Sequence, residues 1–347
     1  MTPQVSVALA AALFVSLLAP LAVRPLLVRL RAFDVPTVRS SHTLPVLRGA
    51  GIAPLLGFLT GMAILLLPGA VHHARPELLA VLLASVSVSL VGLLEDLRGV
   101  RIAVRAGLQM IIGAIATSAL IVAAGFDWWW VPIGAIVFAG YTNVANFMDG
   151  INGISSLHGT AVGIAFAIIG GLIDLPWLVP AGLVFAASFI AFLPWNLRRN
   201  RVFLGDVGSY LLGGGIGVLV IAAILDGAPA VAMAAPLAIY LTDTGVTLLR
   251  RLLRGENWRE PHRKHVYQRL TNVGLSHLTV ALIVTGATIT TSAMGLLTIA
   301  DPKVGWLWAV IAIGIVAGLY LSLPRLFCRL SIATPPAASL DLEKSVK

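Results

Sequence analysis

The sequence predicts an all-α, polytopic integral membrane protein, and three observations support this prediction. Hydrophobic residues make up 58% of the 347 residues and charged residues only 11%, whereas a soluble domain has roughly a quarter of its residues charged. Apolar stretches of about 20 residues, the length that crosses a bilayer as a helix, recur along the chain. The basic residues gather in alternate connections between these stretches. An ordinary water-soluble protein is therefore excluded.

Eleven apolar segments are predicted to form transmembrane helices. They begin near Val5, Gly49, Leu78, Ala106, Val131, His158, Trp177, Tyr210, Pro229, His277 and Gly305. No Lys or Arg precedes the first segment, so it is expected to be a retained helix rather than a cleaved signal peptide. We expect residues 1–330 to form one multi-span domain and residues 331–347 to form a cytoplasmic tail.

The distribution of basic residues predicts the orientation. Of the 24 Lys and Arg residues, 22 fall in five alternate connections, and only Arg75 and Lys303 fall elsewhere. The five connections are 24–48, 95–105, 195–209, 250–276 and the tail after Pro324. These segments and the loop near 146–157 are predicted to be cytoplasmic. Because the number of segments is odd, the N-terminus is expected outside and the C-terminus in the cytoplasm. The net charge of +9 lies in small clusters rather than along one face, so nucleic acid is not an expected partner.

Four compact polar sets lie at the predicted cytoplasmic ends of the helices. The first places two acids before a basic helical face: Glu95, Asp96, Arg98, Arg101, Arg105 and Gln109. The second runs from one helix face into a glycine turn: Asn143, Asn146, Asp149, Gly150, Asn152 and Gly153. The third surrounds an aspartate with glycines: Phe203, Gly205, Asp206, Gly208 and Ser209. The fourth joins an acid to a basic stretch: Asp243, His262, Arg263, Lys264 and His265.

Each set alone has an ordinary structural explanation. Acids with arginines also occur at solvated helix ends, asparagines also join membrane helices, and glycines also make tight turns. His262 and His265 are more typical of a basic flank than of a zinc site. Together, however, the sets place acids, carboxamides and cations at one membrane face, where ionisable groups are usually functional. Oxygen ligands suit Mg²⁺ or Mn²⁺, and arginines and glycines suit phosphates. The combination predicts metal-assisted phosphoryl transfer with a lipid-linked substrate.

The motifs and their order resemble a known superfamily. They read DVPTVRSSHTLPVLRGAG, LLEDLRGVRIAVRAGLQ, NVANFMDGINGISS, FLGDVGS and PHRKHVYQRL, and they span about residues 34–270. They are similar to motifs of the polyprenyl-phosphate N-acetylhexosamine-1-phosphate transferases, glycosyltransferase family 4. The superfamily includes enzymes that initiate O-antigen synthesis and the phospho-N-acetylmuramoyl-pentapeptide transferase of peptidoglycan synthesis. The resemblance implies a bacterial inner-membrane protein whose active site faces the cytoplasm.

The resemblance also implies a reaction and a set of catalytic residues. Undecaprenyl phosphate attacks the β-phosphorus of a UDP-N-acetylhexosamine, UMP leaves, and a diphospho-sugar stays on the lipid. Asp206 corresponds to the principal Mg²⁺ ligand and Asn146 to a second ligand. Glu95 and Asp96 correspond to the acidic pair near the lipid phosphate. A general-base role for Asp96 has less physical support, because a phosphate monoester with a second pKa of about 6 is already largely dianionic at neutral pH.

Further residues are expected to bind substrate by the same resemblance. Phe203 corresponds to a nucleobase contact, and Gly150 and Asn152 to positions that hold the uridine. Diphosphate or sugar contacts are expected from Arg105, Arg263 and His265. The remaining expected substrate-binding residues are Asn143, Asp149 and His262.

Two departures from the family pattern affect the prediction. The family commonly has two aspartates where this chain has Glu95 and Asp96, so one carboxylate lies on a longer arm. Many members end the basic loop with a histidine cluster, whereas this chain has His265, Val266, Tyr267 and Gln268. This ending resembles the O-antigen branch that uses UDP-N-acetylfucosamine or UDP-N-acetylquinovosamine. The alternatives are UDP-N-acetylglucosamine and then the peptidoglycan reaction.

Two other classes of function also fit the composition. A transporter would place ionisable groups near the bilayer midplane and break helices in paired halves, whereas these acids lie at one face. A membrane scaffold would leave the four polar sets without a role. The transferase is therefore the preferred hypothesis.

Overall fold

Helices make up most of the computed structural model, which describes residues 2–34, 46–71, 75–197, 202–256 and 263–333. The helices are α1 (Pro3–Arg29), α2 (Ile52–Leu65), α3 (Arg75–Arg98), α4 (Ile102–Ala124), α5 (Trp130–Met148), α6 (Ile154–Leu172), α7 (Leu178–Asn196), α8 (Gly205–Leu225), α9 (Ala230–Ala234), η1 (Ala235–Leu237), α10 (Ala238–Leu253), α11 (Val266–Asn272), α12 (His277–Gly295), α13 (Leu297–Ala300) and α14 (Gly305–Ala333). Two short strands, β1 (Phe33–Asp34) and β2 (Val46–Leu47), pair antiparallel. Most of the predicted tail, residues 334–347, lies outside the described residues.

The prediction of an all-α, polytopic membrane protein is confirmed. Among the described residues, ten helical segments are long and apolar enough to cross a membrane, where α9 to α10 and α12 to α13 each count as one segment. The segment predicted to begin near Gly49 forms the shorter helix α2, which has 14 residues. At 1.5 Å per residue such a helix extends about 21 Å, less than the hydrocarbon core of about 30 Å. The described part of the chain therefore has ten segments long enough to span a membrane and one shorter apolar helix of 10–17 residues.

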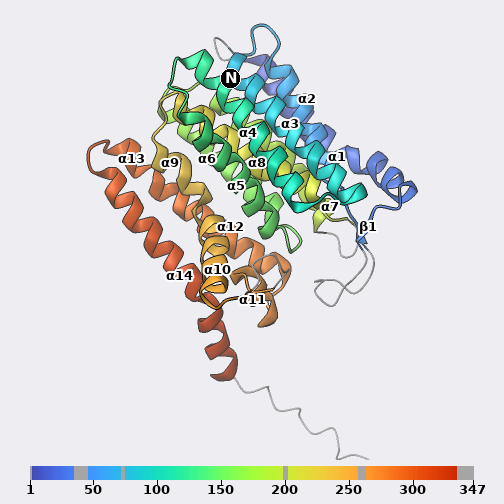
Figure 1. Ribbon diagram of the computed structural model, residues 1–347, viewed down its shortest axis with the longest axis vertical. Helices are drawn as coiled ribbons and strands as arrows, with labels where there is room; N and C mark the ends of the chain where they lie inside the picture. Colours follow the sequence, from blue (N-terminus) through green and yellow to red (C-terminus); the bar gives the residue numbers. More distant parts are fainter. Residues whose placement is uncertain (1, 35–45, 72–74, 198–201, 257–262, 334–347) are drawn as a thin grey trace, which may run out of the picture.

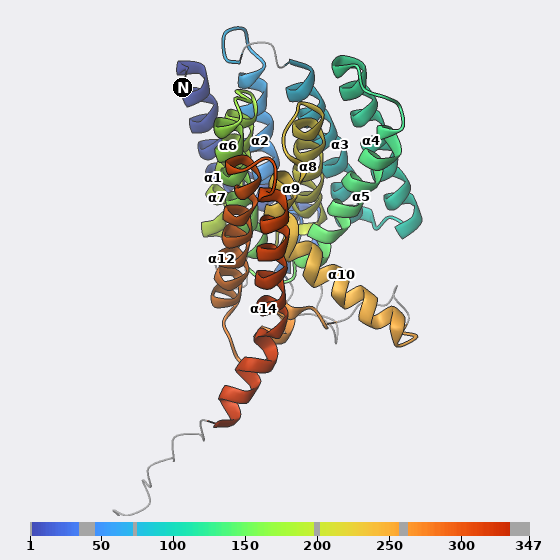
Figure 2. The same ribbon diagram turned by 90° about the vertical axis from the view of Figure 1, so that its left-hand side faces the viewer.

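The long helices run side by side in a bundle (Figure 1). The N-terminus lies at one end of the bundle, and the last turns of α14 lie at the other. This placement agrees with an odd number of crossings. The lower part of α10 leaves the bundle sideways, as the view turned by 90° shows (Figure 2). Which end faces the cytoplasm stays a prediction from the charge distribution.

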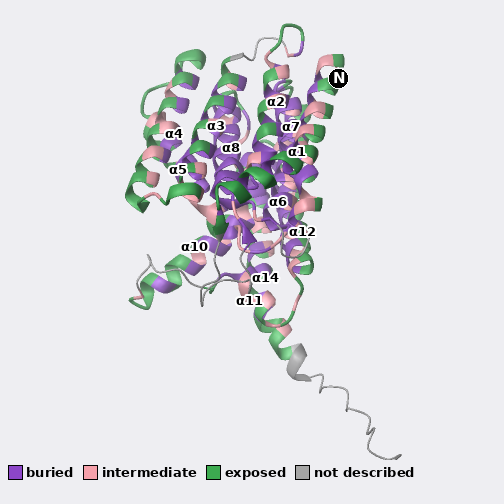
Figure 3. Cartoon of the chain, turned by 90° about the vertical axis from the view of Figure 1, so that its right-hand side faces the viewer, coloured by how far each residue is buried: buried purple, intermediate pink, exposed green. Residues whose placement is uncertain are grey.

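Helix α8 forms the centre of the bundle. Twenty of its 21 residues are buried, and the outward faces of the surrounding helices carry the exposed residues (Figure 3). Its small residues allow neighbouring backbones to approach closely, as at many helix contacts in membranes. A Cβ at Gly213, for example, would lie 2.5 Å from Thr142 Cα of α5. Helix α8 is thus closely packed against α5 at this position.

Three backbone hydrogen bonds join the segment before α2 to the segment before α8. Phe203 N donates to Leu47 O at 2.8 Å, Ala50 N donates to Phe203 O at 3.1 Å, and Gly51 N donates to Leu204 O at 2.8 Å. These bonds place Arg48, which lies between Leu47 and Ala50, beside the first turn of α8.

Candidate active site

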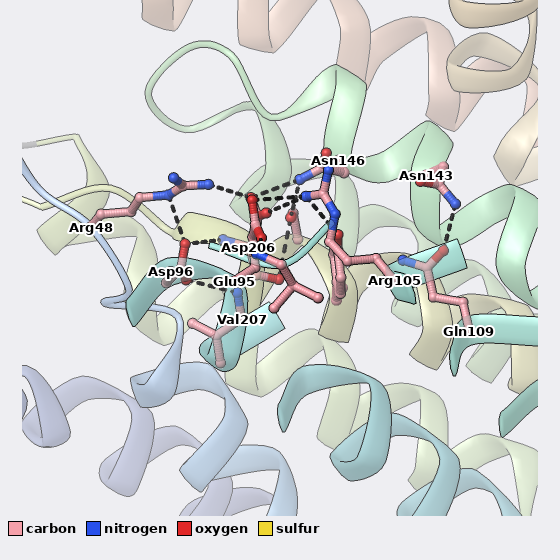
Figure 4. Close-up of polar contacts among 12 residues, drawn as sticks. Arg48, Glu95, Asp96, Arg105, Gln109, Asn143, Asn146, Asp206 and Val207 are labelled. Carbon is pink, nitrogen blue, oxygen red and sulfur yellow. Dashed lines mark hydrogen bonds and ion pairs between the residues drawn. The ribbon is translucent and has the colours of Figure 1, made fainter. Parts of the chain in front are cut away.

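The site is centred on the carboxylate of Asp206 in the first turn of α8. Arg48 Nη2 and Asn146 Nδ2 donate to Asp206 Oδ1 at 2.8 and 3.0 Å. Arg105 Nη1 donates to Oδ2 at 3.3 Å. Figure 4 shows these groups converging on Asp206. The side chain is 9% exposed, so the three donors replace most of its contacts with water.

Asp96, at the end of α3, caps the N-terminus of α8. Its Oδ1 accepts from Asp206 N at 2.9 Å, and its Oδ2 accepts from Val207 N at 3.0 Å. Arg48 Nε also lies 2.7 Å from Oδ1. A carboxylate satisfies the unpaired N–H groups of a helix start and interacts favourably with its dipole. Because the Asp96 side chain is 0% exposed, its geometry favours positioning of Asp206 over direct contact with a substrate.

Glu95 joins the same cluster from the neighbouring turn. Its Oε1 lies 3.1 Å from Arg105 Nη1, and its Oε2 accepts a hydrogen bond from Val100 N. The longer side chain therefore connects the α3–α4 turn to Arg105. Glu95 is 16% exposed, so it is the more accessible member of the acidic pair.

Gly205 allows the close approach of α8 to Asp96. It has a positive φ of 73°, and a Cβ at this position would lie 2.6 Å from Asp96 Oδ2. Gly227, at the other end of α8, has a φ of 93° and no atom within 4 Å of such a Cβ. Both glycines have a positive φ, but only at Gly205 would an added Cβ lie against neighbouring atoms.

Alanine at Gly205 is therefore expected to destabilise the protein more than alanine at Gly227. Both changes incur roughly 1–2 kcal/mol for a left-handed residue with a side chain, but only Gly205→Ala adds a steric clash with Asp96. Thermal unfolding of both variants in detergent measures the difference. Equal melting temperatures would contradict this account of the α3–α8 contact.

The polar residues of α5 divide between two neighbourhoods. Asn146 Nδ2 contacts Asp206 and also donates to Ser209 Oγ at 3.0 Å. Asn143 Nδ2, one turn earlier, instead donates to Gln109 Oε1 of α4 at 2.6 Å, as Figure 4 shows. The three-residue spacing rotates Asn143 away from Asp206. Asn143 is therefore not brought into direct contact with the central carboxylate.

The turn after α5 is built by contacts from several helices. Asp149 Oδ1 accepts from Ser155 Oγ at 2.6 Å. Asn152 N donates to His277 Nδ1 at 3.5 Å, and Gly153 N donates to Asn196 Oδ1 at 2.6 Å. A Cβ on Gly150 would overlap the hydroxyl of Tyr267, so glycine is required for this packing.

The pKa of Asp149 makes stability depend on pH. Burial raises this pKa from 3.8 to about 7, while the hydrogen bond from Ser155 lowers it. The folded protein thus holds the proton where the unfolded chain has lost it. The stability contributed by the protonated carboxyl is full below about pH 4 and is lost as the pH rises through about 7.

Asp149→Asn is therefore expected to gain in melting temperature relative to the wild type as the pH rises from 5 to 8. Ser155→Ala, which removes the bond that lowers the pKa, should steepen the loss of stability. Melting curves in detergent across this pH range measure both effects. A constant difference between Asp149→Asn and the wild type would contradict the raised pKa.

In the described part of the basic loop, one expected substrate contact is buried and the other is exposed. His265 is 4% exposed, and its Nδ1 lies 3.1 Å from Asp243 Oδ1. Arg263 is exposed. His262 lies outside the described residues. Phe203, the expected nucleobase contact, is partly exposed beside the start of α8.

The residues around Asp206 include the types of oxygen ligand that a Mg²⁺ ion would require. Within the described ranges, no group of three His, Cys, Asp or Glu side chains could hold a metal. Mg²⁺ is usually bound by one or two carboxylates, substrate phosphates and water. Asn146 Nδ2 and Asp206 Oδ1 are 3.0 Å apart, and a flip of the amide would present its oxygen instead. Two protein ligands can therefore be supplied.

The structure brings five of the predicted site residues together and adds two that the sequence motifs do not indicate. Glu95, Asp96, Arg105, Asn146 and Asp206 form one cluster. Arg48 was not assigned to the site, although it immediately precedes the Gly-Ala-Gly run of the first motif. Tyr210 was also missed, and its hydroxyl accepts from Arg105 Nη1 at 3.3 Å.

The fold and the site together define a multi-pass membrane protein with a carboxylate, carboxamide and guanidinium site at one end of its bundle. Such a set of groups can bind phosphates and a divalent cation. Comparisons with known proteins identify the family.

The family model described as glycosyl transferase family 4 matches residues 78–224. A probable undecaprenyl-phosphate N-acetylglucosaminyl 1-phosphate transferase of Bacillus subtilis (strain 168) is 25% identical over 79% of this chain and 80% of its own length. A decaprenyl-phosphate N-acetylglucosaminephosphotransferase of Mycobacterium leprae (strain TN) is 27% identical over 74% of each chain. A phospho-N-acetylmuramoyl-pentapeptide-transferase of Desulforudis audaxviator (strain MP104C) is 31% identical over 61% of this chain and 74% of its own. The chain belongs to glycosyl transferase family 4, which confirms the superfamily that its motifs predict.

Proposed function

We propose that this protein transfers an N-acetylhexosamine-1-phosphate from a UDP-sugar to undecaprenyl phosphate and releases UMP. The reaction would initiate an O-antigen or another cell-envelope polysaccharide. The observation that carries the proposal is the Asp206 carboxylate, held by Arg48, Arg105 and Asn146 at one end of a membrane bundle. The names of the relatives support polyprenyl phosphate as the acceptor class.

The proposed chemistry is a displacement at phosphorus. A phosphate oxygen of the lipid attacks the β-phosphorus, the bond from this phosphorus to the bridging oxygen breaks, and UMP leaves with that oxygen. The lipid phosphate needs little help from a base, because its second pKa of about 6 leaves it largely dianionic at neutral pH. Asp96 is therefore proposed to position Asp206, and Glu95 to position Arg105.

The two arginines are proposed to bind phosphate oxygens. Arg48 and Arg105 present guanidinium groups, which match phosphate geometry and stay charged. Mg²⁺ or Mn²⁺, held by Asp206 and Asn146, would neutralise charge on the diphosphate when bound. In a site with little water, fixed charges of this kind stabilise developing negative charge more strongly than they do in bulk solvent.

The donor is proposed to bind between α8 and the turn after α5. Phe203 would contact the nucleobase, and Gly150 and Asn152 would hold the uridine. The other proposed substrate contacts are Asn143, Asp149, His262, Arg263 and His265. This arrangement is supported by the position of Asn146, which contacts Asp206 and lies at the same end of α5 as the turn at Asp149 and Gly150.

The identity of the sugar is the finer part of the proposal. The His-x-Tyr-Gln ending supports UDP-N-acetylfucosamine or UDP-N-acetylquinovosamine by resemblance. Two relatives are named for N-acetylglucosamine, which makes UDP-N-acetylglucosamine the second candidate. In this chain the Tyr267 hydroxyl donates to Phe147 O at 3.0 Å, and Gln268 Nε2 donates to that hydroxyl at 3.2 Å. Both residues thus shape the loop itself.

The site is also proposed to face the cytoplasm of a bacterial inner membrane. The connections at this end of the bundle contain most of the Lys and Arg residues, in agreement with the positive-inside rule. The UDP-sugar would then enter from the cytoplasm and the lipid from the bilayer.

The proposal is tested by release of UMP from a panel of UDP-N-acetylhexosamines. The purified protein, in detergent with Mg²⁺ and undecaprenyl phosphate, is expected to release UMP from at least one of the three named donors. Reactions without the lipid phosphate are the control and should release none. A folded protein that yields no UMP from the whole panel would overturn the proposal.

A further inference from the structure

We infer that Asp243 and Tyr320 are positioning residues, which hold α11 and its His265 against the α5 end of the site. This inference rests on the proposed transfer reaction. Asp243 belongs to α10, and Tyr320 belongs to α14, the last helix of the chain. Neither residue contacts the Asp206 cluster through a described hydrogen bond, so both would act through α11.

The Asp243 carboxylate is fully buried and surrounded by donors. Its Oδ1 accepts from Val266 N at 2.9 Å and lies 3.1 Å from His265 Nδ1. Its Oδ2 accepts from Tyr320 OH at 2.7 Å and from Tyr267 N at 3.3 Å. A buried carboxylate requires such partners, and loss of one removes part of the compensation for its burial.

Asp243 fixes the orientation of the His265 ring. The contact between Nδ1 of His265 and Asp243 Oδ1 restricts rotation of the imidazole. The ring also stacks on Phe147, with centroids 6.5 Å apart and planes at 24°. The imidazole is thus held between the α10 carboxylate and the end of α5.

Helix α11 also contacts the end of α5 through Tyr267. This side chain is 1% exposed, and its hydroxyl donates to Phe147 O at 3.0 Å. Phe147 directly follows Asn146, which contacts Asp206. A continuous set of contacts therefore runs from Tyr320 through Asp243 and α11 to the central carboxylate.

The same capping arrangement occurs at two places among the described residues. Asp96 accepts from the N–H groups of Asp206 and Val207, and Asp243 accepts from those of Val266 and Tyr267. In each case a buried aspartate of one helix holds the first turn of another. Helix α11 has only seven residues, and helices this short are unstable alone. Its placement therefore depends on Asp243.

Removal of the Tyr320 hydroxyl tests the inference. Tyr320→Phe is expected to raise KM for the UDP-sugar about tenfold, the factor that corresponds to 1.4 kcal/mol, with a smaller change in kcat and none in KM for undecaprenyl phosphate. The matched control is Tyr240→Phe, which removes another buried hydroxyl of this region, one that donates to Ile154 O at 3.3 Å. The control should leave both KM values unchanged.

Backbone hydrogen exchange provides a readout that requires no substrate. The amides of Val266 and Tyr267 should exchange faster in Tyr320→Phe, and faster still in Asp243→Asn, than in the wild type or Tyr240→Phe. Equal donor KM values in the two Tyr→Phe variants, or unchanged exchange in α11, would overturn the inference. Absence of UMP release by the wild type would overturn the proposed function instead, and the exchange result would then decide the placement of α11.

Discussion

Replacement of Asp206 by asparagine is expected to lower kcat for UMP release by roughly a hundred- to a thousandfold, the range seen when one preorganised electrostatic contact is lost from an active site. The carboxylate balances Arg48 and Arg105 and accepts from Asn146. An amide carries no charge, and its NH₂ group would face other donors. The variant should therefore lose both the proposed metal ligand and the orientation of both arginines.

The control for this variant lies at the opposite end of the same helix. Asp226 follows the last turn of α8 and accepts from Trp177 Nε1 at 2.7 Å. Asp226→Asn keeps an acceptor oxygen and is expected to retain activity close to that of the wild type. Binding of Mn²⁺, measured by electron paramagnetic resonance, should weaken in Asp206→Asn and not in Asp226→Asn. Retention of wild-type kcat and Mn²⁺ affinity by Asp206→Asn would contradict its assigned role.

Replacement of Arg48 by glutamine is expected to have the second largest effect. Arg48 bridges two carboxylates, with Nε 2.7 Å from Asp96 and Nη2 2.8 Å from Asp206. Breaking a buried ion pair by removing one partner costs about 3–5 kcal/mol, and Arg48 is partly exposed, so the loss of stability should fall below that range. We expect a marked fall in melting temperature and a loss of activity of roughly a hundredfold.

Two further variants test whether the protein requires the Arg48 contacts with both carboxylates or only a positive charge. Arg48→Lys keeps the charge but lacks the planar fork that contacts both carboxylates, so it should recover only part of the activity. Arg101→Gln removes an exposed arginine from the same basic segment as Arg105 and should change little. Full activity in Arg48→Gln, or equal losses of activity in Arg48→Gln and Arg101→Gln, would show that the contacts of Arg48 with Asp96 and Asp206 are not required.

Much of the fold and part of the site followed from local patterns in the sequence. Runs of apolar residues predict membrane helices because each crossing needs a fixed length. The spacing of Glu95, Asp96 and Arg105 at helix ends predicts that they share one face of the membrane, and the structure joins them to Asn146 and Asp206.

Contacts between distant segments could not be predicted in the same way. The capping role of Asp96 depends on the placement of α8 against α3, 110 residues away along the chain. Arg48 contacts Asp206, which is 158 residues away along the chain, because backbone hydrogen bonds join the segments before α2 and α8. Tyr320 lies within a continuous apolar segment, and no local pattern links it to Asp243.

The start of α2 has the same origin. The apolar segment beginning near Gly49 predicts a full span, yet Ala50 and Gly51 pair with Phe203 and Leu204, so the helix begins only at Ile52. Residues that hydropathy assigns to the helix thus form backbone hydrogen bonds with the segment before α8 instead. The same hydrogen bonds place Arg48 at the site.

The central claim is that the cluster around Asp206 performs phosphoryl transfer to a lipid. The most direct measurement follows the label from a UDP-N-acetylhexosamine carrying ³²P in its β-phosphate. With undecaprenyl phosphate and Mg²⁺, the wild type should move this label into the lipid fraction in equal amount to the UMP released, and Asp206→Asn should not. Label that stays in the aqueous phase while UMP forms, or label that reaches the lipid equally in Asp206→Asn, would contradict the claim.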